Sequence, residues 1–290
     1  MGKIGGAAIA IVVLVFASVP AMAGAASYFS PTGSMGTPRY APGASPLPDG
    51  RVLVAGGLVG LNTYGSSAEI FDPVTGTFSP TGSMGSERYG PGAAPLPDGR
   101  VLVAGGRASS GYLDSAELFD PATGTFSPTG SMGAPRFAPV AAALPDGRVL
   151  VAGGSSSGFN GLTSSEIYDP ATGTFSPTGP LGTARLESAA SSLPDGRVLV
   201  VGGRGGDSGS LNSAEIYDPT TGTFSPTSPM SGARLAPGAS PLPDGRVLVV
   251  GGFPAGSSTE LFDPATGTFS PGSPMATARY GPGSGAEPGP

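Results

Sequence analysis

The sequence predicts an all-β chain folded as a β-propeller, and three observations lead to this fold class. The stretch LPDGRVLVAGG at residues 47–57 recurs at 96–106 and 144–154, and returns as LPDGRVLVVGG at 193–203 and 242–252. The spacings of 49, 48, 49 and 49 residues are typical of propellers and related repeat arrays. The 51 glycines and 33 prolines among 290 residues favour turns and disfavour long helices. Each period also holds four short strand-like segments, called a to d here in chain order.

The four segments differ in ways that assign each a place in a sheet. Segment b (RVLVAGG, 100–106) is apolar on both faces, as in a strand that neighbours cover on both sides. Segment c (SAEIFDP, 67–73) is strand-like, and segment d (TFSPTGSM, 77–84) contains a proline, which predicts an outer edge strand. Segment a (YAPGASPL, 40–47) has the small side chains expected of an inner strand near the axis. Complete a–d units occupy 39–84, 88–132, 136–181, 185–230 and 234–275.

The first 26 residues have a different character from the repeats. Lys3 is followed by an uncharged apolar run and then by small residues, the order of a secretory signal peptide. We expect cleavage after Ala23 or Ala25, and we assign residues 27–290 to the propeller. The alternative is an uncleaved membrane anchor, because residues 4–26 carry no charge.

The recurring residues resemble the kelch repeat. That repeat has an Arg before segment a, Gly-Gly after b, aromatic-Asp-Pro after c, an aromatic at the start of d and then a Met. In the second unit these are Arg88, Gly105–Gly106, Phe119–Asp120–Pro121, Phe126 and Met132. The resemblance covers roughly residues 28–283. It implies a kelch-like β-propeller of four-stranded antiparallel blades, similar to the galactose-oxidase central-domain superfamily and to secreted bacterial members.

The sequence leaves the number of blades open. A spare d segment, FSPTGSM, lies at 29–35, and a spare a segment, RYGPG, lies at 279–283. Five full repeats with these two extra strands fit either a five-bladed ring or an incomplete six-bladed one.

Composition excludes several kinds of chemistry. The chain has no His and no Cys, a net charge of −6 and 12% charged residues. We therefore expect no cofactor, no metal and no nucleic-acid partner. Most charges recur in every unit, which indicates a structural role. The Asp of the DPxTGT turn is expected to cap that turn, and the Arg of segment b to pair with the Glu of segment c, as Arg100 with Glu117.

Two sets of residues are candidates for ligand binding. A guanidinium recurs before each segment a, and the kelch resemblance implies that it lies on the face of the b–c and d–a loops near the central opening, where we expect such groups to hold carboxylates or sulfates bidentately. The alternative is that each bonds backbone carbonyls or an acid of the next blade. The second set belongs to the variable b–c loops. The complete list is Arg39, Arg88, Arg136, Arg185, Arg234, Tyr64, Arg107, Tyr112 and Arg204.

We therefore predict a non-catalytic binding module that is secreted, periplasmic or on the cell surface. Its ligand is expected to be a protein or a glycan, anionic where the arginines contribute, and a membrane is a partner only if the N-terminal segment is not cleaved. One alternative is a carbohydrate-active epimerase or hydrolase that uses the unrepeated acids Asp114, Glu187 or Asp207. Another is a fragment of a larger surface protein.

Overall fold

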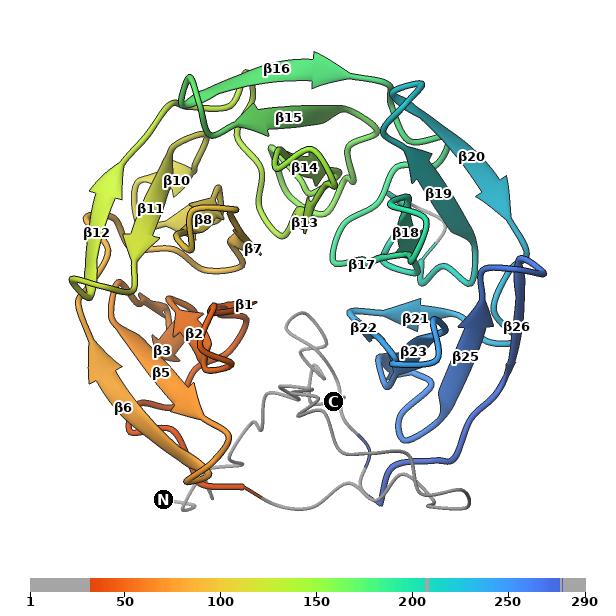
Figure 1. Cartoon of the computed structure of the whole chain (residues 1–290), viewed down its shortest axis with the longest axis horizontal. Helices are drawn as coiled ribbons and strands as arrows, with labels where there is room; N and C mark the ends of the chain where they lie inside the picture. The colour runs from red at the N-terminus through yellow and green to blue at the C-terminus, as the bar shows by residue number, and fades with distance from the viewer. Residues whose placement is uncertain (1–31, 207–208, 277, 279–290) are drawn as a thin grey trace.

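The computed structural model describes residues 32–206, 209–276 and 278. The predicted signal segment 1–26, the spare a segment 279–283 and the start of the spare d segment lie outside these residues. Within the described part, the protein is an all-β, five-bladed propeller of antiparallel four-stranded sheets (Figure 1). No helix that is long and apolar enough to span a membrane occurs in that part.

Each blade orders its strands a, b, c, d from the axis outward, as the sequence predicts. The first blade contains β1 (Gly43–Pro46), β2 (Val52–Ala55), β5 (Ala68–Asp72) and β6 (Thr77–Thr81). The second contains β7 (Gly92–Pro95), β8 (Val101–Ala104), β11 (Ala116–Asp120) and β12 (Thr125–Pro128). The third contains β13 (Val140–Ala143), β14 (Val149–Ala152), β15 (Ser165–Asp169) and β16 (Thr174–Thr178). The fourth contains β17 (Ala189–Ser192), β18 (Val198–Val201), β19 (Ala214–Asp218) and β20 (Thr223–Thr227). The fifth contains β22 (Gly238–Pro241), β23 (Val247–Val250), β25 (Thr259–Asp263) and β26 (Thr268–Pro271).

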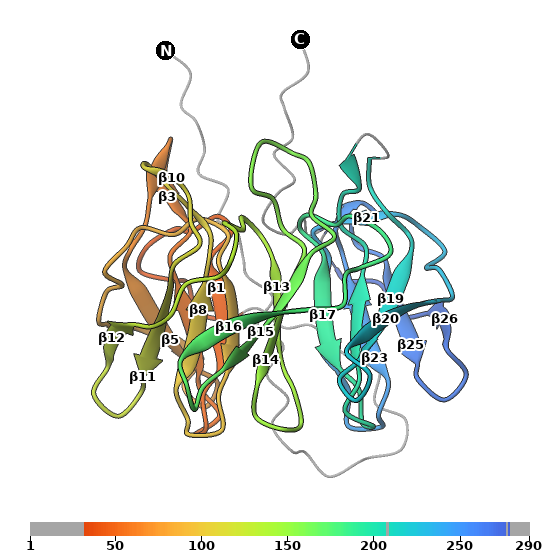
Figure 2. The same cartoon turned by 90° about the horizontal axis from the view of Figure 1, so that it is seen from above.

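Small two-stranded sheets stand on the b–c loop side of the ring. They pair β3 (Leu58–Gly60) with β4 (Thr63–Tyr64), β9 (Arg107–Ala108) with β10 (Gly111–Tyr112), and β21 (Arg234–Leu235) with β24 (Phe253–Pro254). Figure 2 shows β3, β10 and β21 together at the same end of the blades. These loops therefore make up one face of the molecule, called the loop face below.

The core lies between blades because the b strands are apolar on both sides. Leu53 and Ala55 of β2 pack against Val101 and Val103 of β8. The same contact recurs at the next three junctions. A single sheet would leave both of these sides in water, so the repeat acquires its core only by stacking.

The inner strands surround the axis with small residues. They contact one another in the order β1, β7, β13, β17 and β22, whereas β22 and β1 do not pack together in that way. In Figure 1 the described ribbons of the fifth and first blades do not adjoin. A central cavity of about 740 Å³ is lined mainly by alanine, serine, proline and glycine of these strands.

The described end of the spare d segment makes a backbone hydrogen bond that also joins neighbouring blades. The amide of Gly82 donates to the carbonyl of Gly124 in the next blade (3.0 Å). Gly33 donates in the same way to Gly76 of the first blade (2.9 Å), and Met35 packs against the core cluster of that blade. Residues 32–35 thus dock on the first blade as the end of a preceding outer strand would.

Candidate binding surface

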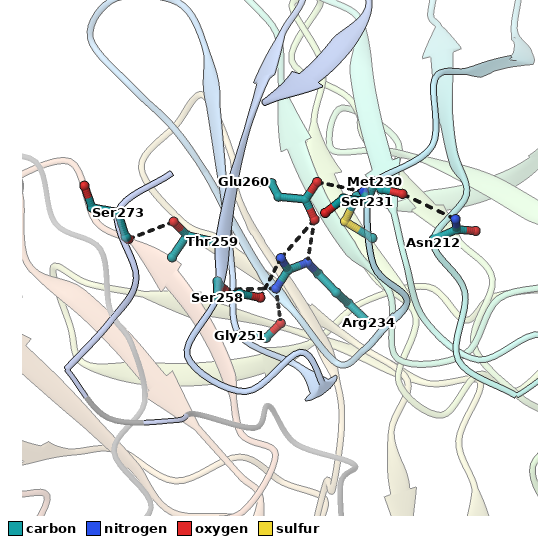
Figure 3. Close-up of polar contacts among 9 residues, drawn as sticks. All are labelled: Asn212, Met230, Ser231, Arg234, Gly251, Ser258, Thr259, Glu260 and Ser273. Atoms are coloured by element: carbon teal, nitrogen blue, oxygen red, sulfur yellow. Dashed lines mark hydrogen bonds and ion pairs between the residues drawn. The ribbon is translucent and has the colours of Figure 1, made fainter. Parts of the chain in front are cut away.

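The arginine before each segment a is buried and fully hydrogen bonded. In the fifth blade, Nη1 of Arg234 donates to the carbonyls of Gly251 (2.7 Å) and Ser258 (3.0 Å) (Figure 3). Its Nη2 donates to Ser258 Oγ (3.0 Å) and Glu260 Oε1 (2.9 Å), and its Nε donates to the same Oε1 (3.3 Å). All five N–H groups of the guanidinium are therefore used inside the blade.

The second carboxylate oxygen of the glutamate, Oε2, accepts a hydrogen bond from the backbone of the d–a connection, which leads into the blade. Glu260 Oε2 accepts from the amide of Ser231 (2.8 Å), and Glu117 Oε2 accepts from Gly85 (2.7 Å). The arginine and glutamate together join the d–a connection, the end of strand b and the start of strand c. The corresponding ion pairs are Arg39–Glu69, Arg88–Glu117, Arg136–Glu166, Arg185–Glu215 and Arg234–Glu260.

This arrangement corrects two expectations from the sequence. The acid that holds each of these arginines belongs to the same blade, not to the next one. A guanidinium whose donors are all used inside the protein has none left for a ligand, so Arg39, Arg88, Arg136, Arg185 and Arg234 do not belong to the candidate surface. Burial lowers the pKa of Arg88, and the charge of Glu117 opposes that shift.

The Arg of segment b has a different partner from the one predicted. Arg100 pairs with Asp98 of the PDG turn (2.7 Å) and not with Glu117, and both side chains are partly exposed. The hydrogen bond from Arg100 lowers the pKa of Asp98. The register of the strands explains the error. Glu117 lies across from Val103, within β8, whereas Arg100 precedes that strand.

The turn aspartates behave as the sequence predicts. Asp120 Oδ1 accepts a hydrogen bond from the amide of Ala122 (2.8 Å), and the same bond recurs in the other four blades. Among the described residues, no group of three His, Cys, Asp or Glu side chains is placed to hold a metal ion.

The symmetry of the propeller is broken at the loop face. In each blade the residue after the buried arginine pairs with the residue after Gly-Gly, so the backbone is the same while the side chains differ. These pairs are Tyr40–Leu58, Tyr89–Arg107, Phe137–Ser155, Leu186–Arg204 and Leu235–Phe253. A site that recognises one ligand needs such unrepeated chemistry.

Five residues of the b–c loops form a continuous row, called the loop belt here. The guanidinium carbon of Arg107 lies 6.0 Å from the ring centre of Tyr64 and 5.4 Å from that of Tyr112. The hydroxyl of Tyr112 accepts from the amide of Gly158 (2.8 Å), next to Phe159. The guanidinium carbon of Arg204 lies 5.0 Å from the ring centre of Phe159. The loop belt is Tyr64, Arg107, Tyr112, Phe159 and Arg204.

A layer of rings supports the belt from the side of the axis. Tyr89 stands 5.9 Å from Tyr40 and 4.8 Å from Phe137 between ring centres, and 6.3 Å from Tyr64. Burial raises the pKa of the Tyr89 hydroxyl, so this group stays neutral. Tyr112 contacts Phe137 edge-on at 6.3 Å. The aromatic layer therefore fixes the position of the belt.

The structure brings together four of the predicted residues and adds one. Tyr64, Arg107 and Tyr112 are in contact, and Arg204 joins them through Phe159, which the sequence analysis missed. The available signal was that Phe159 is the aromatic residue of its variable loop, as Tyr64 and Tyr112 are of theirs. Arg204 Nε is buried and has no hydrogen-bond partner within the described ranges, so a bound acceptor would satisfy it.

Among the described residues, the unrepeated acids Asp114 and Glu187 belong to different blades. Asp114 lies in the second blade, where its carbonyl accepts from Met132 (2.9 Å), and Glu187 lies in the fourth. Asp207 is outside the described residues. Glu87 accepts from the hydroxyl of Ser109 (2.9 Å) at the exposed surface.

Comparison with known families agrees with the architecture. The kelch motif matches residues 39–85, 88–133 and 187–231, which fall in the first, second and fourth blades. No curated protein matches the chain. The motif matches and the five-bladed architecture together support a kelch-repeat β-propeller.

Proposed function

We propose that this protein is a non-catalytic binding module and that its loop belt binds an acidic segment of another protein. The observation that carries the proposal is the row of three aromatic and two arginine side chains across four blades. A kelch propeller fold is consistent with a protein-binding module. Fold alone does not assign a ligand, so the argument rests on the side chains.

The chemistry of the belt suits carboxylates next to apolar side chains. A guanidinium stacked on a ring keeps its edge N–H groups free for a carboxylate, which it binds bidentately. Leu61 and Phe159 of the b–c loops are exposed, at 93% and 65%, and Phe159 lies against Arg204. Exposed aliphatic and aromatic groups favour a polypeptide over a glycan, since interface hot spots are enriched in aromatic residues and arginine.

The first prediction concerns the two belt arginines. Arrays of acidic peptides and of acidic glycans should identify a peptide that binds the mature protein. Arg107→Ala and Arg204→Ala should each weaken that binding by about 1.5–3 kcal/mol, the contribution of a hydrogen bond to a charged group. Affinity should also fall as salt rises, because the contacts are partly solvated. Isothermal titration calorimetry measures both effects.

Arg100→Ala is the matched control, because it removes the same charge from the PDG turn at the opposite end of the blade. It should leave peptide affinity unchanged. Equal losses from Arg100→Ala and Arg107→Ala would show that only net charge matters. Binding of acidic glycans without any acidic peptide would overturn the choice of ligand.

We also propose that the protein is exported, on the strength of the first 26 residues. N-terminal sequencing of the exported protein should begin between Gly24 and Tyr28. An intact Met1 in a membrane fraction would instead establish the uncleaved anchor.

A further inference from the structure

Five residues surround the propeller axis just inside the loop face. Their backbones share a left-handed conformation, with φ between 49° and 63°. Four of the five amides donate to the carbonyl of the preceding member, from Gly90 to Ala41 (2.9 Å) through to Ala236 to Glu187 (2.9 Å). The ring is Ala41, Gly90, Ala138, Glu187 and Ala236. Four members have no side chain beyond a methyl group, and the fourth blade alone contributes a carboxylate.

This ring lines a small cavity of about 100 Å³. The remaining lining is Pro42, Pro91, Pro139, Ser188 and Pro237. Glu187 is therefore the one charged group at the wall, and the hydroxyl of Ser188 is beside it in sequence. The volume corresponds to about three water molecules, given a share of about 30 Å³ each.

The Glu187 carboxylate has no hydrogen bond and no ion pair within the described part of the chain. Burial raises its pKa to about 7, and the charge of Arg204 opposes that shift. Tyr89 is the other titratable group whose charge interacts with it. The Glu187 side chain is half-buried, and a partly desolvated carboxylate without a partner is stabilised by a bound cation.

We propose that this axial cavity binds a primary ammonium group on an unbranched alkyl stem, such as the end of a lysine side chain. The narrow wall of alanine and proline accommodates methylene groups, and Glu187 with Ser188 accepts the ammonium hydrogens. An anionic group would be repelled by the carboxylate of Glu187. The cavity shares no lining residue with the loop belt, although the charge of Arg204 acts on Glu187.

The proposal predicts that the cavity binds an ammonium group more tightly as pH rises. An ammonium group pairs with the ionised carboxylate, so apparent affinity follows the ionised fraction of Glu187. With a pKa of about 7, the association constant should rise about tenfold from pH 6 to pH 8 and then level off. An alkylammonium ion stays charged over this range, so the titration belongs to the protein.

The unliganded protein supplies a second readout. The folded-state pKa of Glu187 lies above the ordinary value of 4.5, so its protonated form favours folding and this contribution is lost as pH rises through about 7. The Tm of Glu187→Ala minus the Tm of the parent, measured at the same pH, should therefore increase from pH 4.5 to pH 7.5. Alanine occupies this ring position in three other blades, so the variant is expected to fold.

Titration of the full-length protein with n-butylammonium chloride, followed by NMR, tests the site. 1-Butanol and butyrate, with the same stem, should bind at least tenfold more weakly at pH 8. Glu187→Ala and Glu187→Gln should each weaken butylammonium binding at least tenfold and remove its pH dependence. Nα-acetyl-lysine N-methylamide distinguishes the source: binding as tight as that of butylammonium indicates a lysine side chain, and weaker binding indicates a free amine.

Two results would overturn the proposal. One is equal binding of 1-butanol and butylammonium, which would make the cavity merely apolar. The other is butylammonium binding that survives in both Glu187 variants, or that is absent from the parent protein at pH 8. Because Glu187→Gln keeps the size of the side chain, a folding defect in the alanine variant would not rescue the proposal.

Discussion

Replacing Arg88 with alanine is expected to lower the free energy of unfolding by about 3–5 kcal/mol. The change removes five hydrogen bonds and leaves Glu117 charged and unpaired inside the second blade. The carbonyls of Gly105 and Ser115 lose a donor as well, and buried acceptors without partners add to the cost. Thermal and denaturant unfolding of the full-length protein measure the effect.

The control is again Arg100→Ala, whose ion pair with Asp98 is partly exposed. Exposed pairs contribute about 0–1 kcal/mol, so this variant should unfold close to the parent. Arg136→Ala and Arg185→Ala should repeat the loss seen with Arg88→Ala, because their bonds are the same. Stable variants of these arginines with a loss of anion binding would restore them to the ligand site and refute the structural role.

Replacing Val103 with aspartate should cost at least about 3 kcal/mol. Val103 is fully buried in β8, packs against the first blade and lies directly across from Glu117. A carboxylate there would be desolvated and would face a second negative charge. At about 2–4 °C per kcal/mol for a chain of this size, Tm should fall by at least about 6 °C.

Thr63→Asp is the matched control for this substitution. Thr63 is exposed in the b–c loop of the first blade, and its replacement should change stability by no more than about 0.5 kcal/mol. Equal decreases in Tm for the two variants would mean that β8 is not a central strand.

The fold was predictable because each repeat encodes its strand positions locally. The apolar run of segment b, the small residues of segment a and the proline of segment d correctly placed the middle, inner and outer strands. The partners of the repeated charges were not predictable in the same way. Sequence spacing placed Arg100 and Glu117 in neighbouring segments, but the structure puts Glu117 across from Val103 and pairs it with Arg88.

The candidate surface was predictable only in part. Tyr64, Arg107, Tyr112 and Arg204 stood out because the repeats do not contain them, and their contacts depend on how loops of different blades fold toward each other. Phe159 enters the belt through the hydrogen bond between Gly158 and Tyr112, a contact across 46 residues. The environment of Glu187 could not be predicted, because it is formed by the ring residues of the other four blades and no single repeat contains them.

Hydrogen–deuterium exchange with a bound acidic peptide tests most directly the claim that ligands bind at the unrepeated residues of the loop face. The account predicts slower exchange in the b–c loops at 58–66, 107–115 and 155–164, with the PDG turns at 48–50 and 97–99 unchanged. Slower exchange confined to the PDG turns or to the outer strands β6, β12 and β16 would contradict it.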